Sequence, residues 1–227
     1  MVVSFAGGVR DAIGRRGYVE VASGEIAAVD LSQGTMLWRR AAVGRPIAAT
    51  PDRLLTLDVA GNAFVVRFLD GQSGADAGQA EVTGMPDWAR TTGLATDAVQ
   101  MTATEVPEGV ELRWRVRQPY RGGAPPPRAI SATAESAVTG SLIVDPQASR
   151  VVSTADPRAD KEIETPFHQQ SSEPHVLAVG RIDDRTFTLE GTGSEIVLEA
   201  RAGSDNQLLW RLPLATQRAS RPPPLRK

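Results

Sequence analysis

The side chains best able to do chemistry in this sequence lie in one stretch, residues 156–175. Both histidines of the chain, His168 and His175, lie there among three glutamates, one of which is Glu164. Imidazole and carboxylate groups bind zinc, nickel or copper, and they can act as an acid–base pair near neutral pH. Glu164, His168 and His175 are therefore candidate metal ligands, and they would support a metal-assisted hydrolase or lyase.

The same stretch has a simpler interpretation as a polar surface loop. Its spacing matches no known metal-ligand motif, and a long irregular excursion between strands is polar for solubility alone. The chain has no cysteine, no nucleophile elbow, no phosphate-binding glycine–lysine loop and no zinc-protease helix motif. From these patterns we assign no catalytic residue and no cofactor, and we favour a protein that is not an enzyme.

Strand-forming segments surround this stretch and follow one pattern five times. Each copy has an apolar strand, an acidic residue in most copies, a tight turn and a second apolar strand; the copies lie at residues 25–38, 64–74, 103–114, 142–149 and 196–210. Their spacing is close to a period of about 40 residues, which is typical of the blades of a β-propeller. No segment shows a convincing helical period.

The acidic residue and the turn have expected structural roles. We expect Asp30, Asp70 and Asp145 to accept hydrogen bonds from the N–H groups of the turns that follow them. Glycines that close turns, Gly34, Gly74 and Gly109, permit the left-handed backbone that such turns need. A ring of carboxylates around a central cation is the alternative, which we do not favour.

Three tryptophans follow these turns, in the first, third and fifth copies. They are Trp38, Trp114 and Trp210, and smaller residues, Gly78 and Ser153, hold the matching places in the second and fourth copies. Because a tryptophan buries a large ring surface, we expect each to pack between neighbouring blades. A ligand platform built from these rings is the alternative.

These patterns predict an all-β fold. We expect a β-propeller of about five blades, each with three to four antiparallel strands; the alternative is an open or partial propeller that completes itself by association. Residues 1–213 would form the single propeller domain, with a loop insertion near 156–175. Residues 214–227 would form a flexible, basic, proline-rich tail.

Composition excludes several partners. A formal net charge of -2 provides no basic surface for neutralising phosphates, so we expect no nucleic acid. No run of apolar residues is long enough to span a membrane as a helix. The first residues do not look like a signal peptide, so we expect a cytoplasmic protein as written, or a bacterial envelope or secreted protein if a leader has been removed.

Residues 28–39 resemble the repeat of the pyrroloquinoline-quinone-like (PQQ-like) β-propellers. There, Asp30 precedes a turn that closes at Gly34, and Trp38 follows; residues 200–213 are similar but lack the aspartate. The resemblance extends over residues 18–213 and is specific to fold. Quinone dehydrogenases of that superfamily use a vicinal cysteine pair, and its assembly lipoproteins begin with a lipidated cysteine. This chain has no cysteine, so the resemblance implies the bacterial-type scaffold without the quinone site.

The functional expectation is a non-catalytic scaffold that presents loops to a protein, peptide or sugar. Residues 121–128 and 156–175 are the longest irregular excursions and would carry the contacts. A protein or peptide is the expected partner, and a homo-oligomer is expected if the ring is open. The enzyme whose site lies at residues 162–175 is the alternative.

Overall fold

The computed structural model describes residues 4–5, 8–22, 25–61, 63–85, 99–117, 137–155, 176–192 and 195–216. The elements it contains are strands throughout, which confirms the predicted all-β class. No helix suited to crossing a membrane lies in these ranges.

The strands form four antiparallel sheets, named here A to D in chain order. Sheet A contains β1 (Ser4–Phe5), β2 (Gly8–Arg10), β3 (Arg16–Ala22), β4 (Glu25–Asp30) and β5 (Thr35–Arg40). Sheet B contains β6 (Arg45–Ala49), β7 (Arg53–Ala60), β8 (Ala63–Asp70) and β9 (Asp76–Glu81). Sheet C contains β10 (Val99–Val106), β11 (Gly109–Arg117), β12 (Ala137–Asp145) and β13 (Arg150–Ala155). Sheet D contains β14 (Val176–Ile182), β15 (Arg185–Thr192), β16 (Glu195–Ala202) and β17 (Leu208–Thr216).

The described residues therefore form four sheets where the sequence repeat predicted about five blades. The third copy of the pattern, residues 103–114, is the hairpin of β10 and β11, and the fourth copy, residues 142–149, leads from β12 into β13. Both copies lie in sheet C, whose strands pair in the order β10-β11-β12-β13. One sheet contains two hairpins with similar sequences, so counting the pattern overcounts the sheets.

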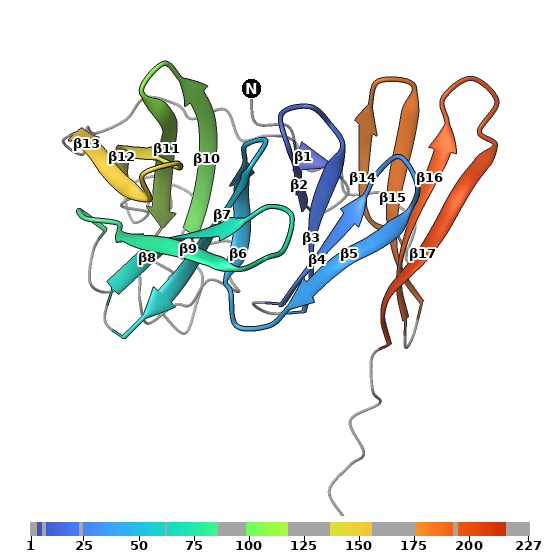
Figure 1. Cartoon of the computed structure of the whole chain (residues 1–227), viewed down its shortest axis with the longest axis horizontal. Helices are drawn as coiled ribbons and strands as arrows, with labels where there is room; N and C mark the ends of the chain where they lie inside the picture. The colour runs from blue at the N-terminus through green and yellow to red at the C-terminus, as the bar shows by residue number, and fades with distance from the viewer. Residues whose placement is uncertain are drawn as a thin grey trace, which may run out of the picture.

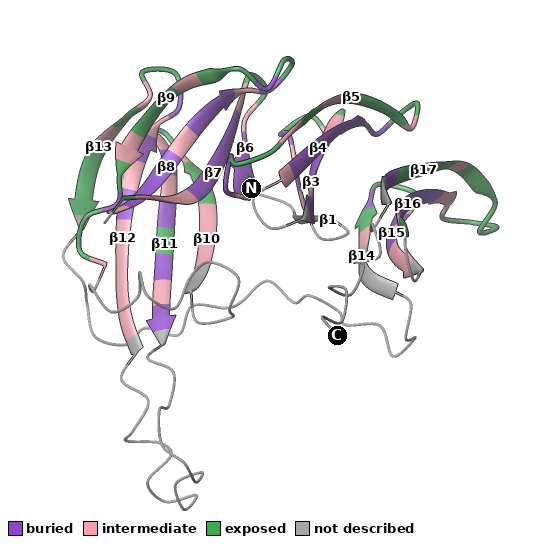
Figure 2. Ribbon diagram, turned by 90° about the horizontal axis from the view of Figure 1, so that it is seen from below, coloured by how far each residue is buried: buried purple, intermediate pink, exposed green. Residues whose placement is uncertain are grey.

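The sheets pack face to face in the spatial order D, A, B, C, as Figure 1 shows from right to left. Three hydrophobic clusters lie between them, one between D and A, one between A and B, and one between B and C. Figure 2 shows sheets C and D at the two ends of this arc. The ring is open between two sheets that are consecutive in the chain, in agreement with the predicted alternative of an open or partial propeller.

Each sheet carries a β-bulge at the same place on its outermost strand. The register shifts in the pairing of β4 with β5, β8 with β9, β12 with β13 and β16 with β17. The extra residues are Leu37, Ala77, Val152 and Leu209. Because side chains alternate between the faces of a strand, an extra residue shifts the next side chain to the opposite face. The bulge thus points the following residue toward a neighbouring sheet: Trp38 toward sheet B, Gly78 toward sheet C and Trp210 toward sheet A. Ser153 holds the same position in sheet C.

Candidate interaction surface

The outer rim of the arc is built from four turns, each of which connects the last two strands of a sheet. In sheet A, Asp30 ends β4, and its Oδ1 accepts the N–H groups of Ser32 at 2.9 Å and Gln33 at 3.1 Å. The Ser32 hydroxyl donates to the same oxygen at 2.6 Å. A carboxylate that binds these N–H groups fixes the turn and leaves Gly34 in the left-handed region, with φ of 68°.

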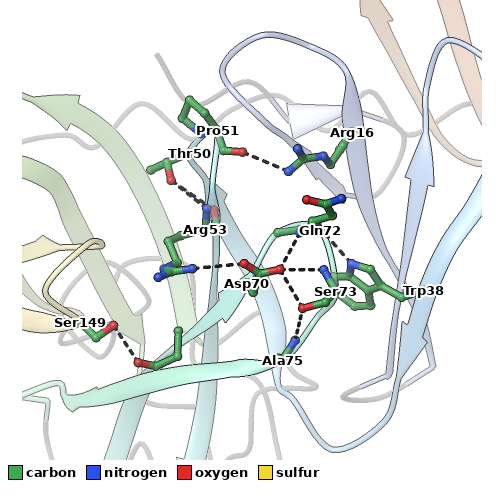
Figure 3. Close-up of polar contacts among 12 residues, drawn as sticks. Arg16, Trp38, Thr50, Pro51, Arg53, Asp70, Gln72, Ser73, Ala75 and Ser149 are labelled. Atoms are coloured by element: carbon green, nitrogen blue, oxygen red, sulfur yellow. Dashed lines mark hydrogen bonds and ion pairs between the residues drawn. The ribbon is translucent and has the colours of Figure 1, made fainter.

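Sheet B repeats this geometry at Asp70, as Figure 3 shows. The Asp70 Oδ1 accepts the N–H of Ser73 at 2.8 Å and the Ser73 hydroxyl at 2.7 Å, while Arg53 lies 3.4 Å from Oδ2. Hydrogen bonds from the Ser73 hydroxyl and backbone lower the pKa of Asp70. For Asp30, burial raises the pKa, but the hydrogen bonds from Ser32 and Gln33 outweigh it and the pKa is lowered. Both aspartates are therefore held ionised as parts of the turns.

The turns of sheets C and D depart from this form in different ways. The Asp145 Oδ1 accepts the N–H groups of Gln147 at 2.9 Å and Ala148 at 3.0 Å, but Ser149 instead of glycine closes the turn, with φ of 53°. In sheet D, Ala202 stands where the other sheets have aspartate, so the turn is held by backbone hydrogen bonds, such as the one from the N–H of Asn206 to the carbonyl of Ala202.

The junction between sheets A and B is made by Trp38. Its Nε1 donates to the carbonyl of Gly71 at 3.1 Å, and the Tyr18 hydroxyl donates to the same carbonyl at 3.1 Å. The indole covers the next glycine of the turn so closely that a Cβ on Gly74 would lie 2.8 Å from the ring. Burial raises the pKa of Tyr18 to about 12. A tryptophan from one sheet is thus seated on the turn of the next.

The junction between sheets D and A has the same form with different hydrogen bonds. Trp210 covers Gly34, where an added Cβ would overlap the indole ring. The Trp210 Nε1 is buried without a hydrogen-bond partner, and Arg185 donates to the carbonyl of Leu31 at 3.3 Å. The Leu31 carbonyl holds the position in sheet A that Gly71 holds in sheet B. An arginine therefore takes the hydrogen bond that Trp38 makes in the neighbouring junction.

The junction between sheets B and C has no tryptophan on its outer strand. Gly78 stands at that position, and a Cβ on it would lie 2.7 Å from the Cβ of Ser149, whose hydroxyl donates to the carbonyl of Ala77 at 3.1 Å. The large ring of this junction is Trp114, which is 1% exposed and lies across from Gly140 in the pairing of β11 with β12.

The expected equivalence of the three tryptophans therefore needs a correction. Trp38 and Trp210 lie on the outermost strands β5 and β17, whereas Trp114 lies on β11, the second strand of its sheet. All three pack against neighbouring strands or turns instead of forming a common platform. Gly109, which was expected to close a turn, begins β11 with φ of 142°, and an added Cβ there would overlap the carbonyl of Val144.

Sequence patterns missed a set of exposed apolar side chains on the outer strands. Met36 and Leu37 on β5 are 38% and 42% exposed, and Leu208 and Leu209 on β17 are 46% and 44% exposed. The two strands belong to adjacent sheets, and Arg39 of β5 donates to the carbonyl of Leu214 in β17 at 2.7 Å. We name these four side chains the apolar rim. The signal for it was two apolar residues directly before each outer tryptophan.

The candidate metal ligands Glu164, His168 and His175 lie outside the described residues, as do the excursion at 121–128 and residues 217–227 of the predicted tail. Within the part of the chain that the structure describes, no group of three or more histidine, cysteine, aspartate or glutamate residues could hold a metal ion. The metal hypothesis therefore remains a prediction about residues 162–175.

Comparison with known proteins gives structural neighbours alone. No family model and no curated protein sequence matches the chain. Among solved structures, the chain is similar to BamB from Moraxella catarrhalis (12% identity, 89% of this chain and 59% of that one, TM-score 0.38). It is also similar to the Dos1 propeller (8% identity, 90% and 46%, TM-score 0.37). A third is the quinohemoprotein alcohol dehydrogenase from Comamonas testosteroni (14% identity, 93% and 42%, TM-score 0.33). The chain spans about half the length of these matched chains, at 59%, 46% and 42%.

Proposed function

We propose that this chain is a non-catalytic scaffold that binds a protein or peptide through the apolar rim. The observation that carries the proposal is the exposure of Met36, Leu37, Leu208 and Leu209 on two adjacent outer strands. Single exposed apolar residues are common, but two successive ones on each of two neighbouring outer strands expose apolar area whose coverage by a partner gains free energy. A sugar, the other expected ligand class, would favour polar contacts.

The backbone beneath the apolar rim supports this role. β5 and β17 are the last strands of their sheets, and among the described residues no further strand pairs with their outer sides. The indole of Trp210 on Gly34 and the hydrogen bond from Arg39 to Leu214 fix the two strands relative to each other. A rigid surface loses little conformational entropy on binding, and this favours recognition of an extended segment with apolar side chains.

The test is quantitative co-purification with the full chain and a double variant, Leu37→Asp with Leu209→Asp. Both positions are exposed, so the variant should melt within a few degrees of the wild type. We expect at least one protein recovered with the wild type to be lost with the variant. Titration of that purified protein by calorimetry should give a Kd raised about tenfold or more, since burying a charge at an apolar contact costs over a kilocalorie per mole.

The matched control is Gln79→Asp on β9, which adds a charge to an exposed outer strand outside the apolar rim. Its recovery of partners should equal that of the wild type. The proposal fails if every partner of the wild type binds the double variant and the control equally well.

A further inference from the structure

Three sheet-to-sheet junctions join the arc, and the place of a fourth, from sheet C to sheet D, is open. Sheets C and D follow each other in the chain, yet the three hydrophobic clusters of the described residues lie between D and A, A and B, and B and C. Each of these two sheets consequently has one face turned away from its packed neighbour, as Figure 2 shows. We call these the C end face and the D end face.

The C end face is polar. In β11, Leu112 and Trp114 lie in the core with sheet B, so alternation places Glu111, Arg113 and Arg115 on the opposite face. Arg113 and Glu111 form an ion pair at 3.0 Å. The strands beside β11 place Thr102, Thr104, Thr139 and Ser141 on this face, together with one apolar residue, Ile143, which pairs with Glu111.

The D end face carries charged side chains as well, together with two apolar residues: Val197 of β16, which is 2% exposed, and Leu208 of β17, which pairs with Arg201. Leu198 and Ala200 of β16 lie in the core with sheet A, so Glu199 and Arg201 are on the opposite face. Glu199 pairs with Arg201 at 3.0 Å and with Arg211 of β17 at 3.2 Å. β15 adds Thr186 and Thr188 to the face, through their pairing with Arg201 and Glu199.

The packed junctions are chemically different from these end faces. The face of β8 that meets sheet C presents Phe64, Val66 and Phe68, all nearly fully buried. If sheets C and D of two molecules packed in the same manner, arginines and threonines would have to be buried. Desolvating an ion pair and a set of hydroxyl groups costs free energy that their mutual contacts do not fully recover.

The open place between sheets C and D also lacks the outer tryptophan and the turn carboxylate that the A–B and D–A junctions have. Sheet C has Ser153 at the position of Trp38 and Trp210, so no large ring projects from its outer strand. Sheet D has Ala202 at the position of Asp30 and Asp70, so its turn lacks the carboxylate. The outer tryptophan and the turn carboxylate of the A–B and D–A junctions are thus both absent here, in addition to the apolar core.

We infer that the C and D end faces are polar caps of an open arc, and that neither packs against a second copy of the chain. Repeat proteins need such polar terminal faces to stay soluble, because their inner repeats are apolar on both sides. The inference replaces the earlier expectation that an open ring would complete itself by association. It does not depend on the proposed function, because it rests on the sheet order and on the charged residues of the two end faces, although Leu208 of the apolar rim lies beside Arg201 on sheet D.

Sedimentation equilibrium of the full chain, from micromolar to near-millimolar concentration, tests this inference. We expect no self-association that depends on the end faces, and a mass of 24.2 kDa if no other surface associates. Dimers that dissociate in Arg113→Glu with Arg115→Glu, but persist in Leu37→Asp with Leu209→Asp, would overturn the inference. Dimers with the reverse behaviour would use the apolar rim and leave the end faces as caps.

A second variant makes the C end face apolar, with Glu111→Val, Arg113→Val and Arg115→Val. We expect it to self-associate at concentrations where the wild type does not, because it exposes a continuous apolar sheet face. Glu199→Val with Arg201→Val is the matching variant on the D end face and replaces the first if that one does not fold. A folded variant of either kind that stays monomeric would show that polarity is not what keeps the ends apart.

Discussion

The A–B and B–C junctions each pack one large aromatic ring between two sheets, but they place it at different depths. At A–B, Trp38 projects from the outer strand and covers the turn at Gly74. At B–C, the outer position is Gly78, which closely contacts Ser149, and the large ring is Trp114 in the interior. An outer glycine lets the rims of the two sheets approach closely, and the volume is supplied deeper in the junction. The bulge sets the geometry in both cases, and the residue after it decides where the ring lies.

The largest expected effect separates the interior tryptophan from the outer ones. Trp114→Ala should lower the free energy of unfolding by about 3–5 kcal/mol, because its ring is fully buried between two sheets. Trp38→Ala should cost about 2 kcal/mol, since that ring is half-buried. Urea unfolding followed by circular dichroism measures both. Equal losses would show that the two junctions do not differ as described.

The next prediction tests the contact between an outer tryptophan and the turn glycine that it covers. Gly34→Ala should cost about 3 kcal/mol, because the new Cβ meets the Trp210 ring and the backbone is left-handed. Gly61→Ala is the matched control: its φ of 59° is similar, but an added Cβ has nothing within 4 Å. The control should lose about 1 kcal/mol. If thermal melting gives the same loss for both, Trp210 does not sit on Gly34.

A smaller effect distinguishes the two outer tryptophans from each other. Trp38→Phe removes the hydrogen bond to the Gly71 carbonyl and should cost about 1 kcal/mol beyond the lost ring area. Trp210→Phe removes a buried donor that has no partner, so the penalty for that donor disappears and the net cost should be close to zero. The difference between the two unfolding free energies is the quantity to measure. A larger loss for Trp210→Phe would contradict the assignment of a hydrogen bond to the Trp38 Nε1 and of none to the Trp210 Nε1.

The smallest expected effect is the loss of the stabilising contribution of Asp70 at low pH. Because hydrogen bonds from Ser73 lower the folded pKa of Asp70, its contribution to stability is fully present above its unfolded pKa of about 3.9. That contribution is lost as the pH falls toward the lowered folded pKa. Asp70→Asn should therefore be less stable than the wild type at neutral pH, and the difference should shrink below about pH 4. Melting temperatures across this range check it, with Asp205→Asn in the sheet D turn as control.

The sequence predicted the parts of this fold that depend on local chemistry. Alternating apolar residues and turn glycines identified the strands, and Asp30, Asp70 and Asp145 in fact bind the N–H groups of their turns. The assignment of hairpins to sheets failed because the hairpin of β10 and β11 and that of β12 and β13 share one pattern and one sheet. Local residues do not specify which hairpins pair side by side.

The apolar rim was harder to predict from the sequence for a related reason. The apolar rim depends on bulges, which show only in the register between two strands. Leu37 and Leu209 therefore look like ordinary core residues beside a tryptophan. The polar end faces were equally hidden, since alternation of Glu111 and Arg113 with Leu112 is also what any half-exposed strand would show.

Distances between the four bulge positions test the open arc most directly. The chain has no cysteine, so spin labels can be placed at pairs of engineered cysteines at Leu37, Ala77, Val152 and Leu209, one per sheet. Double electron–electron resonance should give a longer distance for Val152 with Leu209, across the opening, than for Leu37 with Leu209 or Ala77 with Val152, across packed junctions. Equal distances for all three pairs would mean a closed ring and would contradict the account.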